Sequence, residues 1–160
     1  MGYVRLFLLG ALMLAGWWAS VVPGYPQDPH AVQSLAIDQV DAIIRQPGHC
    51  LVAVMASWCR PCIEELPLLK VLDDKYRPQG LKTIGLSVDY AGPQAIQPMI
   101  DKVRPDFPVY WIGEAGLDAY AVSRIPLLIF VRNGQTVQRL QGRRSQAEIE
   151  REIAAFIAVP

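Results

Sequence analysis

Two cysteines three residues apart, Cys59 and Cys62, are the side chains with the clearest capacity for chemistry. They follow an apolar run, residues 50–55, that suits a buried strand, and they precede residues 63–70, where apolar positions recur at helical spacing. A pair at such a turn can close a small disulfide ring. The helix N-terminus presents free N–H groups and the positive end of the helix dipole, so it favours the thiolate that attacks disulfides. A Cys-x-x-Cys in this position indicates redox chemistry.

The two residues between the cysteines support this interpretation. Arg60 places a fixed positive charge beside Cys59, and Pro61 suits the first turn of a helix because its missing N–H would find no helical partner there. Once Cys59 has formed a mixed disulfide, a second thiol within reach must release it. Cys62 lies one helical turn further on and can do so.

The first 22 residues differ in composition from the rest of the chain. Arg5 is their one charged side chain, and residues 6–22 carry no charge. This length lies between the core of a signal peptide and a membrane-spanning helix, and either interpretation exports the remainder. We expect residues 1–22 to be an uncleaved anchor, with a cleaved signal as the alternative, because Trp17 and Trp18 spoil a cleavage site and suit a membrane interface. Residues 23–34 then form an extended linker.

Residues 35–160 are expected to form a single domain with enough chain to bury a core. The formal net charge is zero, so nothing suggests a nucleic-acid partner, and we expect a monomer. An N-terminal anchor would hold this domain on the periplasmic, or extracytoplasmic, face of the inner membrane. Disulfides persist there, so a Cys-x-x-Cys pair must be kept reduced by a partner or else act as an oxidant.

Alternating strand and helix patterns predict an α/β fold with a mixed central sheet flanked by helices. Asp38 is the expected N-cap of the first helix, and Asn133-Gly134 predicts a hairpin. Pro67 is expected to kink its helix, and Pro98 is expected to break or kink its own. A capping box at 145–148 predicts the start of the last helix. The predicted strands are 50–55, 81–88, 107–111, 127–131 and 135–140, and the predicted helices are 39–46, from the cysteines to about 76, 92–103, 116–122 and 145–158.

The order and spacing of these elements resemble the thioredoxin fold over residues 35–158. Within that fold the chain is most similar to the membrane-tethered bacterial reductases of the TlpA and ResA type. The specific match is the motif Ala56-Ser-Trp-Cys-Arg-Pro-Cys62. Three further features support the resemblance: the sequence Glu-Leu-Pro at 65–67, an extra helical insert between residues 89 and 107, and Arg-Ile-Pro at 124–126 ahead of a strand.

The resemblance implies roles for the residues around the motif. Cys59 is then the exposed nucleophile, Cys62 the buried resolving thiol, and the two form the redox disulfide. A cis peptide bond is implied before Pro126, opposite the disulfide, and it leaves the backbone of Ile125 free to pair with an incoming polypeptide. The other expected substrate contacts flank the nucleophile: Trp58, Arg60 and Pro61.

Glu65 is expected to exchange a proton with Cys62, because ResA-like reductases carry an acidic residue at this offset. A partly buried carboxylate one turn beyond Cys62 can accept the proton of the thiol. The alternative is an exposed helix carboxylate, a role that suits Glu64. Thioredoxin has a buried aspartate six residues before its first cysteine, where this chain has Ala53, so Glu65 or water must move the proton.

The remaining candidates have structural interpretations. Cys50 begins its strand too far from Cys59 to pair with it, so we expect a buried free thiol. The same distance argues against a metal site formed by His49, Cys50 and the cysteine pair. His30 is expected to be solvated in the linker. Three arginines are expected to form an exposed basic edge without a site role: Arg139, Arg143 and Arg144.

The resemblance implies an extracytoplasmic thiol-disulfide oxidoreductase that works as a reductase without a cofactor. Its electrons would come from a membrane reductase of the DsbD or CcdA kind. Its substrates would be protein disulfides, above all the haem-binding Cys-x-x-Cys-His of apocytochrome c. Two alternatives remain open: a disulfide-inserting oxidase, because Arg60 favours the thiolate, and a copper-delivery accessory protein that binds Cu(I) through the dithiol.

Overall fold

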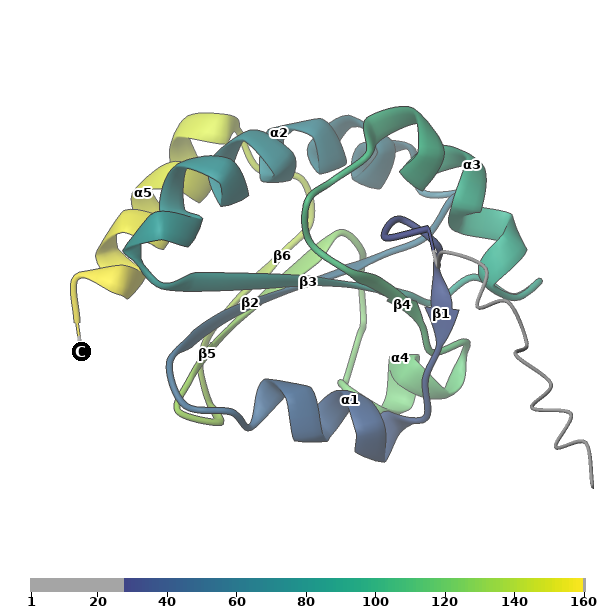
Figure 1. Cartoon of the computed structure of the whole chain (residues 1–160), viewed down its shortest axis with the longest axis horizontal. Helices are drawn as coiled ribbons and strands as arrows, with labels where there is room; N and C mark the ends of the chain where they lie inside the picture. The colour runs from purple at the N-terminus through teal and green to yellow at the C-terminus, as the bar shows by residue number, and fades with distance from the viewer. Residues whose placement is uncertain (1–27, 160) are drawn as a thin grey trace, which may run out of the picture.

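The computed structural model describes residues 28–159, which form a six-stranded mixed sheet in the order β1-β4-β3-β2-β5-β6 (Figure 1). The expected α/β class is confirmed. The strands are β1 (Gln33–Ser34), β2 (His49–Met55), β3 (Leu81–Ser87), β4 (Val109–Trp111), β5 (Leu127–Arg132) and β6 (Gln135–Gln141). The helices are α1 (Ile37–Ile44), α2 (Arg60–Tyr76), α3 (Pro93–Val103), α4 (Ala115–Ala119) and α5 (Gln146–Ile157), and a 3₁₀ turn (Arg77–Gln79) follows α2.

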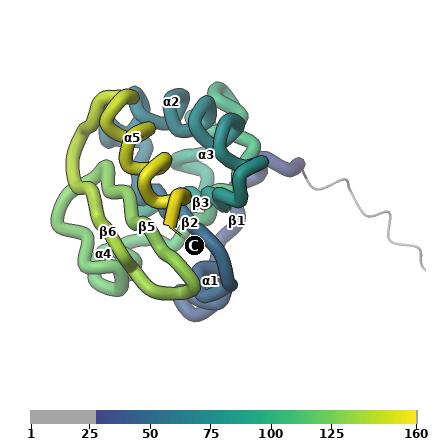
Figure 2. Tube along the Cα trace, turned by 90° about the vertical axis from the view of Figure 1, so that its left-hand side faces the viewer, coloured from purple at the N-terminus to yellow at the C-terminus, as the bar shows by residue number. Residues whose placement is uncertain are grey.

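Helices cover both faces of the sheet. α1 and α4 lie on one face, and α2, α3 and α5 lie on the other (Figures 1 and 2). The central strands β2 and β3 are buried along most of their length, as expected for continuous apolar runs in a covered sheet. The core therefore has two layers, with fully buried side chains such as Leu51 of β2, Leu66 of α2 and Ile153 of α5.

The strand order brings three connecting segments together at one end of the central strands. β2 and β3 are parallel, with Met55 opposite Ser87, so the segments that follow them leave the sheet side by side. β5 is antiparallel to β2, with Leu127 opposite Val54, so the segment before β5 reaches the same end of these strands. The cysteine turn (56–59), the β3–α3 loop (88–92) and the α4–β5 loop (120–126) therefore converge.

The local signals for the hairpin and the last helix are confirmed. Asn133 and Gly134 both have positive φ, 48° and 78°, as the tight turn between β5 and β6 requires. The Oγ of Ser145 accepts the N–H of Glu148, whose carboxylate accepts the N–H of Ser145, so the capping box forms at the start of α5. The predicted insert is also present as α3.

The expected N-cap of the first helix is wrong. α1 has its N-cap at Ala36, not Asp38, because Ala36 is extended and its N–H is accepted by the side chain of Gln39 at 2.9 Å. Asp38 instead lies in the first turn. α2 continues through Pro67 and α3 through Pro98, so the expected bend at each proline stays a prediction and neither helix is interrupted.

The N-terminal expectations meet the structure only in part. The predicted anchor, residues 1–22, lies outside the described residues, as do residues 23–27 of the linker. Gln33 and Ser34 pair with β4 and Val32 is buried in the core, so the folded part begins before residue 35, where the domain was expected to start. His30 is not simply solvated, because it is half-buried with its Nδ1 3.1 Å from the carbonyl oxygen of Pro105. Among the helices of residues 28–159, none has the length and apolar character needed to cross a membrane.

Candidate active site

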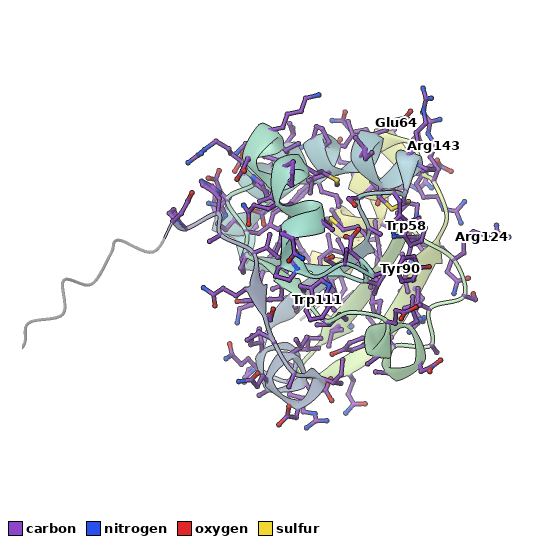
Figure 3. The ribbon with its side chains drawn as sticks, turned by 90° about the vertical axis from the view of Figure 1, so that its right-hand side faces the viewer. Trp58, Glu64, Tyr90, Trp111, Arg124 and Arg143 are labelled. Carbon is purple, nitrogen blue, oxygen red and sulfur yellow. A yellow bond between two sulfur atoms is a disulfide. The ribbon has the colours of Figure 1, made fainter. Side chains whose placement is uncertain are left out.

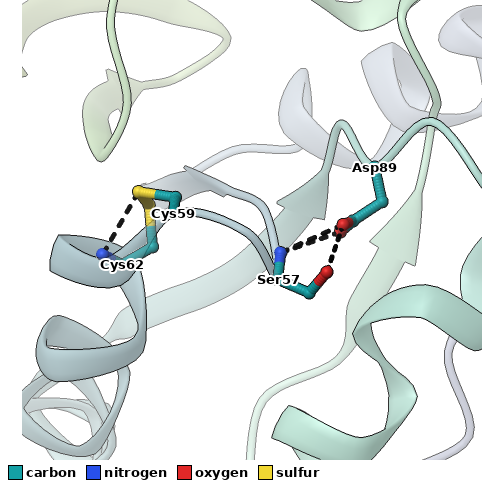
Figure 4. Close-up of a disulfide and its surroundings, with 4 residues drawn as sticks. All are labelled: Ser57, Cys59, Cys62 and Asp89. Carbon is teal, nitrogen blue, oxygen red and sulfur yellow. Dashed lines mark hydrogen bonds between the residues drawn. A yellow bond between two sulfur atoms is a disulfide. The ribbon is translucent and has the colours of Figure 1, made fainter.

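The Cys59–Cys62 pair forms a disulfide at the N-terminus of α2, a helix of 17 residues. Cys59 is the N-cap, with extended backbone, and the N–H of Cys62 donates to its Sγ at 3.3 Å (Figure 4). The N–H of Cys59 in turn bonds to the carbonyl of Ala56 at 3.1 Å, which tightens the turn after β2. The sulfur of Cys59 thus sits where helix N–H groups stabilise negative charge.

The burial of the two cysteines differs from expectation in degree. Cys59 is 6% exposed and Cys62 2%, so Cys59 is the more accessible of the two. Neither is open to solvent in this disulfide form. An attacking partner must therefore approach through the side chains around the turn.

The residues between the cysteines point away from the core. Pro61 occupies the first turn of α2, as its missing N–H favours. The Arg60 side chain is 90% exposed, and its Nε donates to Glu64 at 3.3 Å. Its charge beside Cys59 is therefore partly compensated by the carboxylate of Glu64, which was expected only to be solvated.

Pro126 follows a cis peptide bond, as the resemblance implied. Its carbonyl accepts the N–H of Gly142 at 2.8 Å, which ties the α4–β5 loop to the end of β6. Since Leu127 lies opposite Val54, Ile125 and Pro126 lie beside the end of β2, from which the cysteine turn departs. No backbone-to-backbone hydrogen bond joins Ile125 to any residue within 28–159.

Glu65 is buried one turn beyond Cys62, on the same face of α2. It is 4% exposed, and its Oε2 has no hydrogen-bond partner among the described residues. Burial raises the pKa of Glu65 from 4.5 to about 7, while the backbone N–H and the charge of Arg144 oppose this in part. A carboxyl group with this pKa can give up or take a proton near neutral pH.

Glu65 lines a cavity of about 430 Å³, here called the Glu65 cavity. Pro61 and Glu64 line it from α2, and Arg143 and Arg144 line it from the loop before α5. Arg143 bonds to Glu64 at 3.2 Å. Both arginines are exposed, as expected, and in addition they line the cavity beside Glu65. The third member of the expected edge, Arg139, instead donates to the carbonyls of Tyr120 and Ala121.

Asp89, in the β3–α3 loop, is a residue that sequence reasoning missed. Its carboxylate is buried and accepts the N–H of Ser57 at 3.0 and 3.1 Å, the hydroxyl of Ser57 at 2.6 Å, and the hydroxyl of Ser87 at 2.7 Å (Figure 4). Ser57 lies two residues before Cys59. Asp89 thus holds the cysteine turn to the end of β3. A signal for Asp89 existed in the sequence, because this carboxylate directly follows the predicted strand 81–88. That strand is parallel to the strand that precedes the cysteine motif, so the two segments that follow these strands lie near each other.

Trp58 is exposed beside the cysteine turn. Its indole stacks on the ring of Tyr90, with centroids 5.5 Å apart and planes 2° from parallel (Figure 3). Tyr90 follows Asp89, whose carbonyl accepts the Nε1–H of Trp111 at 2.7 Å. The β3–α3 loop therefore supports the tryptophan beside the nucleophile, and Tyr90 is a second residue that the sequence analysis did not identify.

A second cavity, of about 380 Å³, lies beside Trp58 and is here called the Trp58 cavity. Leu117, Val122 and Ile125 contribute apolar surface to it, and Arg124 lines it as well. Trp58 and Ile125, expected to contact substrate, are thus brought together by the fold. The other expected contact in this loop, Pro126, adjoins them in the chain.

Cys50 and His49, which were expected to lie far from the cysteine pair, lie at the opposite end of β2. Cys50 is buried, unpaired and opposite Lys82 and Val131, at the other end of β2. Burial raises the pKa of its thiol to about 11, against the opposing charge of Lys82. His49 contacts the carbonyl of Val159 at 2.8 Å. In the described part of the chain, no three histidine, cysteine or acidic side chains gather as a metal site would require.

A mixed sheet between helices, a disulfide at the N-terminus of the helix after a central strand, and a cis-proline loop beside it define a thioredoxin-fold protein with a dithiol site. Solved structures of this class share the fold. A thiol:disulfide interchange protein of Chlorobium tepidum superposes with a TM-score of 0.63 at 18% identity, covering 73% of this chain and 84% of that one. StoA of Bacillus subtilis gives 0.59 at 18% identity, covering 68% and 84%.

In sequence, the chain is related to the thiol-disulfide oxidoreductases named ResA. It is 27% identical over 97 residues to ResA of Bacillus thuringiensis subsp. konkukian, a match that covers 59% of this chain and 55% of that protein. The match thus spans about half the length of that relative. No family model matches the chain.

Proposed function

We propose that this chain is an extracytoplasmic thiol-disulfide oxidoreductase that reduces disulfides of client proteins through Cys59 and Cys62. The observation that carries the proposal is the position of the pair: Cys59 is the N-cap of α2, with a helix N–H directed at its sulfur. The relatedness to ResA supports the same chemistry. The membrane anchor in residues 1–22 is part of the proposal and rests on composition.

The reaction begins with the reduced dithiol. The Cys59 thiolate attacks one sulfur of a client disulfide, forming a mixed disulfide and releasing the first client thiolate, which takes a proton from solvent. Cys62, once deprotonated, attacks the Cys59 sulfur and releases the second client thiolate. Two electrons pass to the client, and the protein is left with the Cys59–Cys62 disulfide.

Glu65 serves the second step in this proposal. Cys62 is buried and must lose its proton before it attacks, and Ala53 leaves no carboxylate at the preceding strand position. Glu65 lies on the same helix face and its pKa is about 7, so it can accept that proton and later return it through the Glu65 cavity.

The client segment lies along the α4–β5 loop in this proposal. The backbone of Ile125 is available for pairing with an extended chain, and Trp58 with the Trp58 cavity offers apolar surface next to Cys59. Apocytochrome c is the client we favour, and a membrane dithiol donor of the DsbD or CcdA kind would return the protein to its reduced state. Both assignments rest on the resemblance to TlpA and ResA.

The cysteines have separable roles, and two variants of the full chain test them. Cys59→Ser should abolish reduction of a disulfide peptide, because the attacking thiolate is gone. Cys62→Ala should accumulate mixed disulfides with the peptide, visible by mass spectrometry, because nothing resolves them. Cys50→Ala is the matched control and should behave as wild type. Turnover in the Cys59→Ser variant would disprove the proposal.

The reduction potential of the pair decides the direction of electron flow. A value near or below about −250 mV belongs to a reductant, and a value near about −120 mV belongs to an oxidant. Equilibration of the full chain with glutathione buffers measures it. The oxidising value would overturn the reductase assignment and leave a disulfide-inserting enzyme.

A further inference from the structure

Four exposed arginines lie around the two cavities beside the disulfide. Arg60 adjoins Cys59, Arg124 lines the Trp58 cavity, and the Glu65 cavity is lined by Arg143 and Arg144. Figure 3 shows Arg124 and Arg143 on the face that carries Trp58 and Tyr90. Because the net charge of the whole chain is zero, four arginines here represent a local concentration of positive charge.

The arginines come from three separate segments that the fold brings together. Arg60 begins α2, Arg124 precedes the cis-proline, and Arg143 and Arg144 follow β6. The bond between Gly142 and Pro126 joins the last two segments, and the side chain of Arg124 lies over Gly142. Arg143 reaches α2 through Glu64.

Acidic side chains around these cavities do not balance the arginines. Glu64 is shared between Arg60 and Arg143, at 3.3 and 3.2 Å. Glu65 is buried, and its raised pKa leaves it partly uncharged at neutral pH. Within residues 28–159, neither Arg124 nor Arg144 takes part in a direct ion pair, although the charge of Arg144 also acts on Glu148 and Glu152 of α5. Positive charge therefore faces outward on both sides of the cysteine turn.

The same face exposes apolar surface. The Trp58–Tyr90 stack is open to solvent, and Leu117, Val122 and Ile125 line the neighbouring cavity. An occupant that complements this face needs an apolar side chain for the Trp58 cavity and negative charges on either side of it. A polypeptide segment with acidic residues flanking its disulfide meets both requirements.

We propose that the arginine rim, formed by Arg60, Arg124, Arg143 and Arg144, selects client segments whose disulfide is flanked by acidic side chains and an apolar residue. This inference rests on the proposed function and names its substrate class. Charges at the rim of a binding surface act mainly on the rate of encounter, so the preference should appear in kcat/KM and weaken as salt screens it.

Three disulfide peptides of equal length test the inference on the reduced full chain. Each carries one leucine, and the residues flanking the disulfide are glutamate, glutamine or lysine. We expect kcat/KM to fall in that order and the spread to narrow between low and high salt. In Arg124→Gln and Arg143→Gln, the acidic-to-basic ratio should fall about two- to fivefold each, which is the effect of one exposed ion pair. Arg45→Gln, an equal charge change at the C-cap of α1, should keep the wild-type ratio.

The outcomes separate this inference from the proposed function. Equal reduction of all three peptides, or an unchanged ratio in both rim variants, would overturn the selectivity and leave the reductase assignment standing. Failure to reduce any peptide would overturn the reductase. In that case, tighter binding of the acidic peptide than of the other two to the oxidised protein would still support selection by the arginine rim. Equal binding of the three peptides would overturn it. Binding of anionic phospholipid vesicles through the rim, without a peptide preference, would assign the arginines to the membrane surface instead.

Discussion

Glu65 is a carboxyl group that the fold removes from water without giving its Oε2 a partner among the described residues. Burial raises its pKa from 4.5 to about 7 in the disulfide form. The folded protein thus holds this proton more tightly than the unfolded chain does. Stability from this group is greatest below pH 4.5 and falls as the pH rises toward and past 7, because the fold must then contain a buried charge.

Glu65→Gln should remove this pH dependence. The difference between a pKa of 4.5 and one of about 7 corresponds to about 3 kcal/mol. The unfolding free energy of the variant, relative to that of wild type, should therefore rise by up to this amount when the pH is raised from 5 to 8. Urea unfolding of the oxidised protein at both pH values measures it. Release of the mixed disulfide should also lose its pH inflection near 7.

Glu64→Gln is the matched control, since Glu64 is an exposed neighbour on the same helix. The difference in unfolding free energy between Glu64→Gln and wild type should stay nearly the same at pH 5 and at pH 8. If the difference in unfolding free energy between Glu65→Gln and wild type were also the same at both pH values, the raised pKa of Glu65 would be disproved.

The sequence contained enough information to predict the chemistry of these residues but not their surroundings. Cys59 and Cys62 follow from their spacing and their place between a strand and a helix, whereas Glu65 and Pro126 follow from the resemblance to the TlpA and ResA type. Asp89 and Tyr90 were missed because their partners, Ser57 and Trp58, lie more than 30 residues away. Contacts between two loops depend on strand register, which periodicity does not reveal.

The cysteine turn, as an element, is held at both ends. The start of α2 secures Cys59, and the buried carboxylate of Asp89 secures Ser57 through its N–H and its hydroxyl. The same loop supports Trp58 through Tyr90. Asp89 touches no reacting atom, so its role is to position the turn.

Asp89→Asn should loosen the turn, because an amide cannot accept from all the donors that the carboxylate serves. We expect a loss of about 1.5–3 kcal/mol in unfolding free energy, the range for hydrogen bonds to a charged group. A change in the reduction potential and in the fluorescence of Trp58 should accompany it. Asp73→Asn, at the other end of α2 and equally buried, should lose stability without changing the potential. Equal potentials for wild type and Asp89→Asn would leave Asp89 a purely structural residue.

Elements were predictable where one local signal dominates. The capping box at Ser145, the turn at Asn133-Gly134 and the apolar run of β2 each specify their structure within a few residues. Asp38 failed as a cap because Gln39 satisfied the N–H of Ala36 instead. β1 was missed because two residues paired at a sheet edge carry no periodicity.

At the scale of the whole molecule, the fold was predictable because its order of strands and helices matches one known arrangement. The distribution of charge over the surface was not. Arg124 and Arg143 are separated by a hairpin in the sequence, and only the sheet brings them to one face. A net charge of zero conceals that asymmetry.

Cys50 is the third thiol of the chain, buried at the end of β2 remote from the active pair. Its pKa of about 11 keeps it protonated at neutral pH, and its burial excludes reagents. Alkylation should therefore modify no thiol in the folded disulfide form and two after mild reduction. The third should react only at the rate at which the sheet opens. Rapid labelling of Cys50 in the native protein, followed by mass spectrometry, would contradict this.

The position of Cys50 has a practical consequence for the unmodified protein. Because opening of the central strand exposes this thiol, the extent of its labelling over time reports how often individual molecules unfold. The readout needs no engineered probe and no optical signal. In the oxidised protein, the Cys59–Cys62 disulfide protects the other two sulfurs from the reagent, so the persistence of the native state could be followed through Cys50 alone.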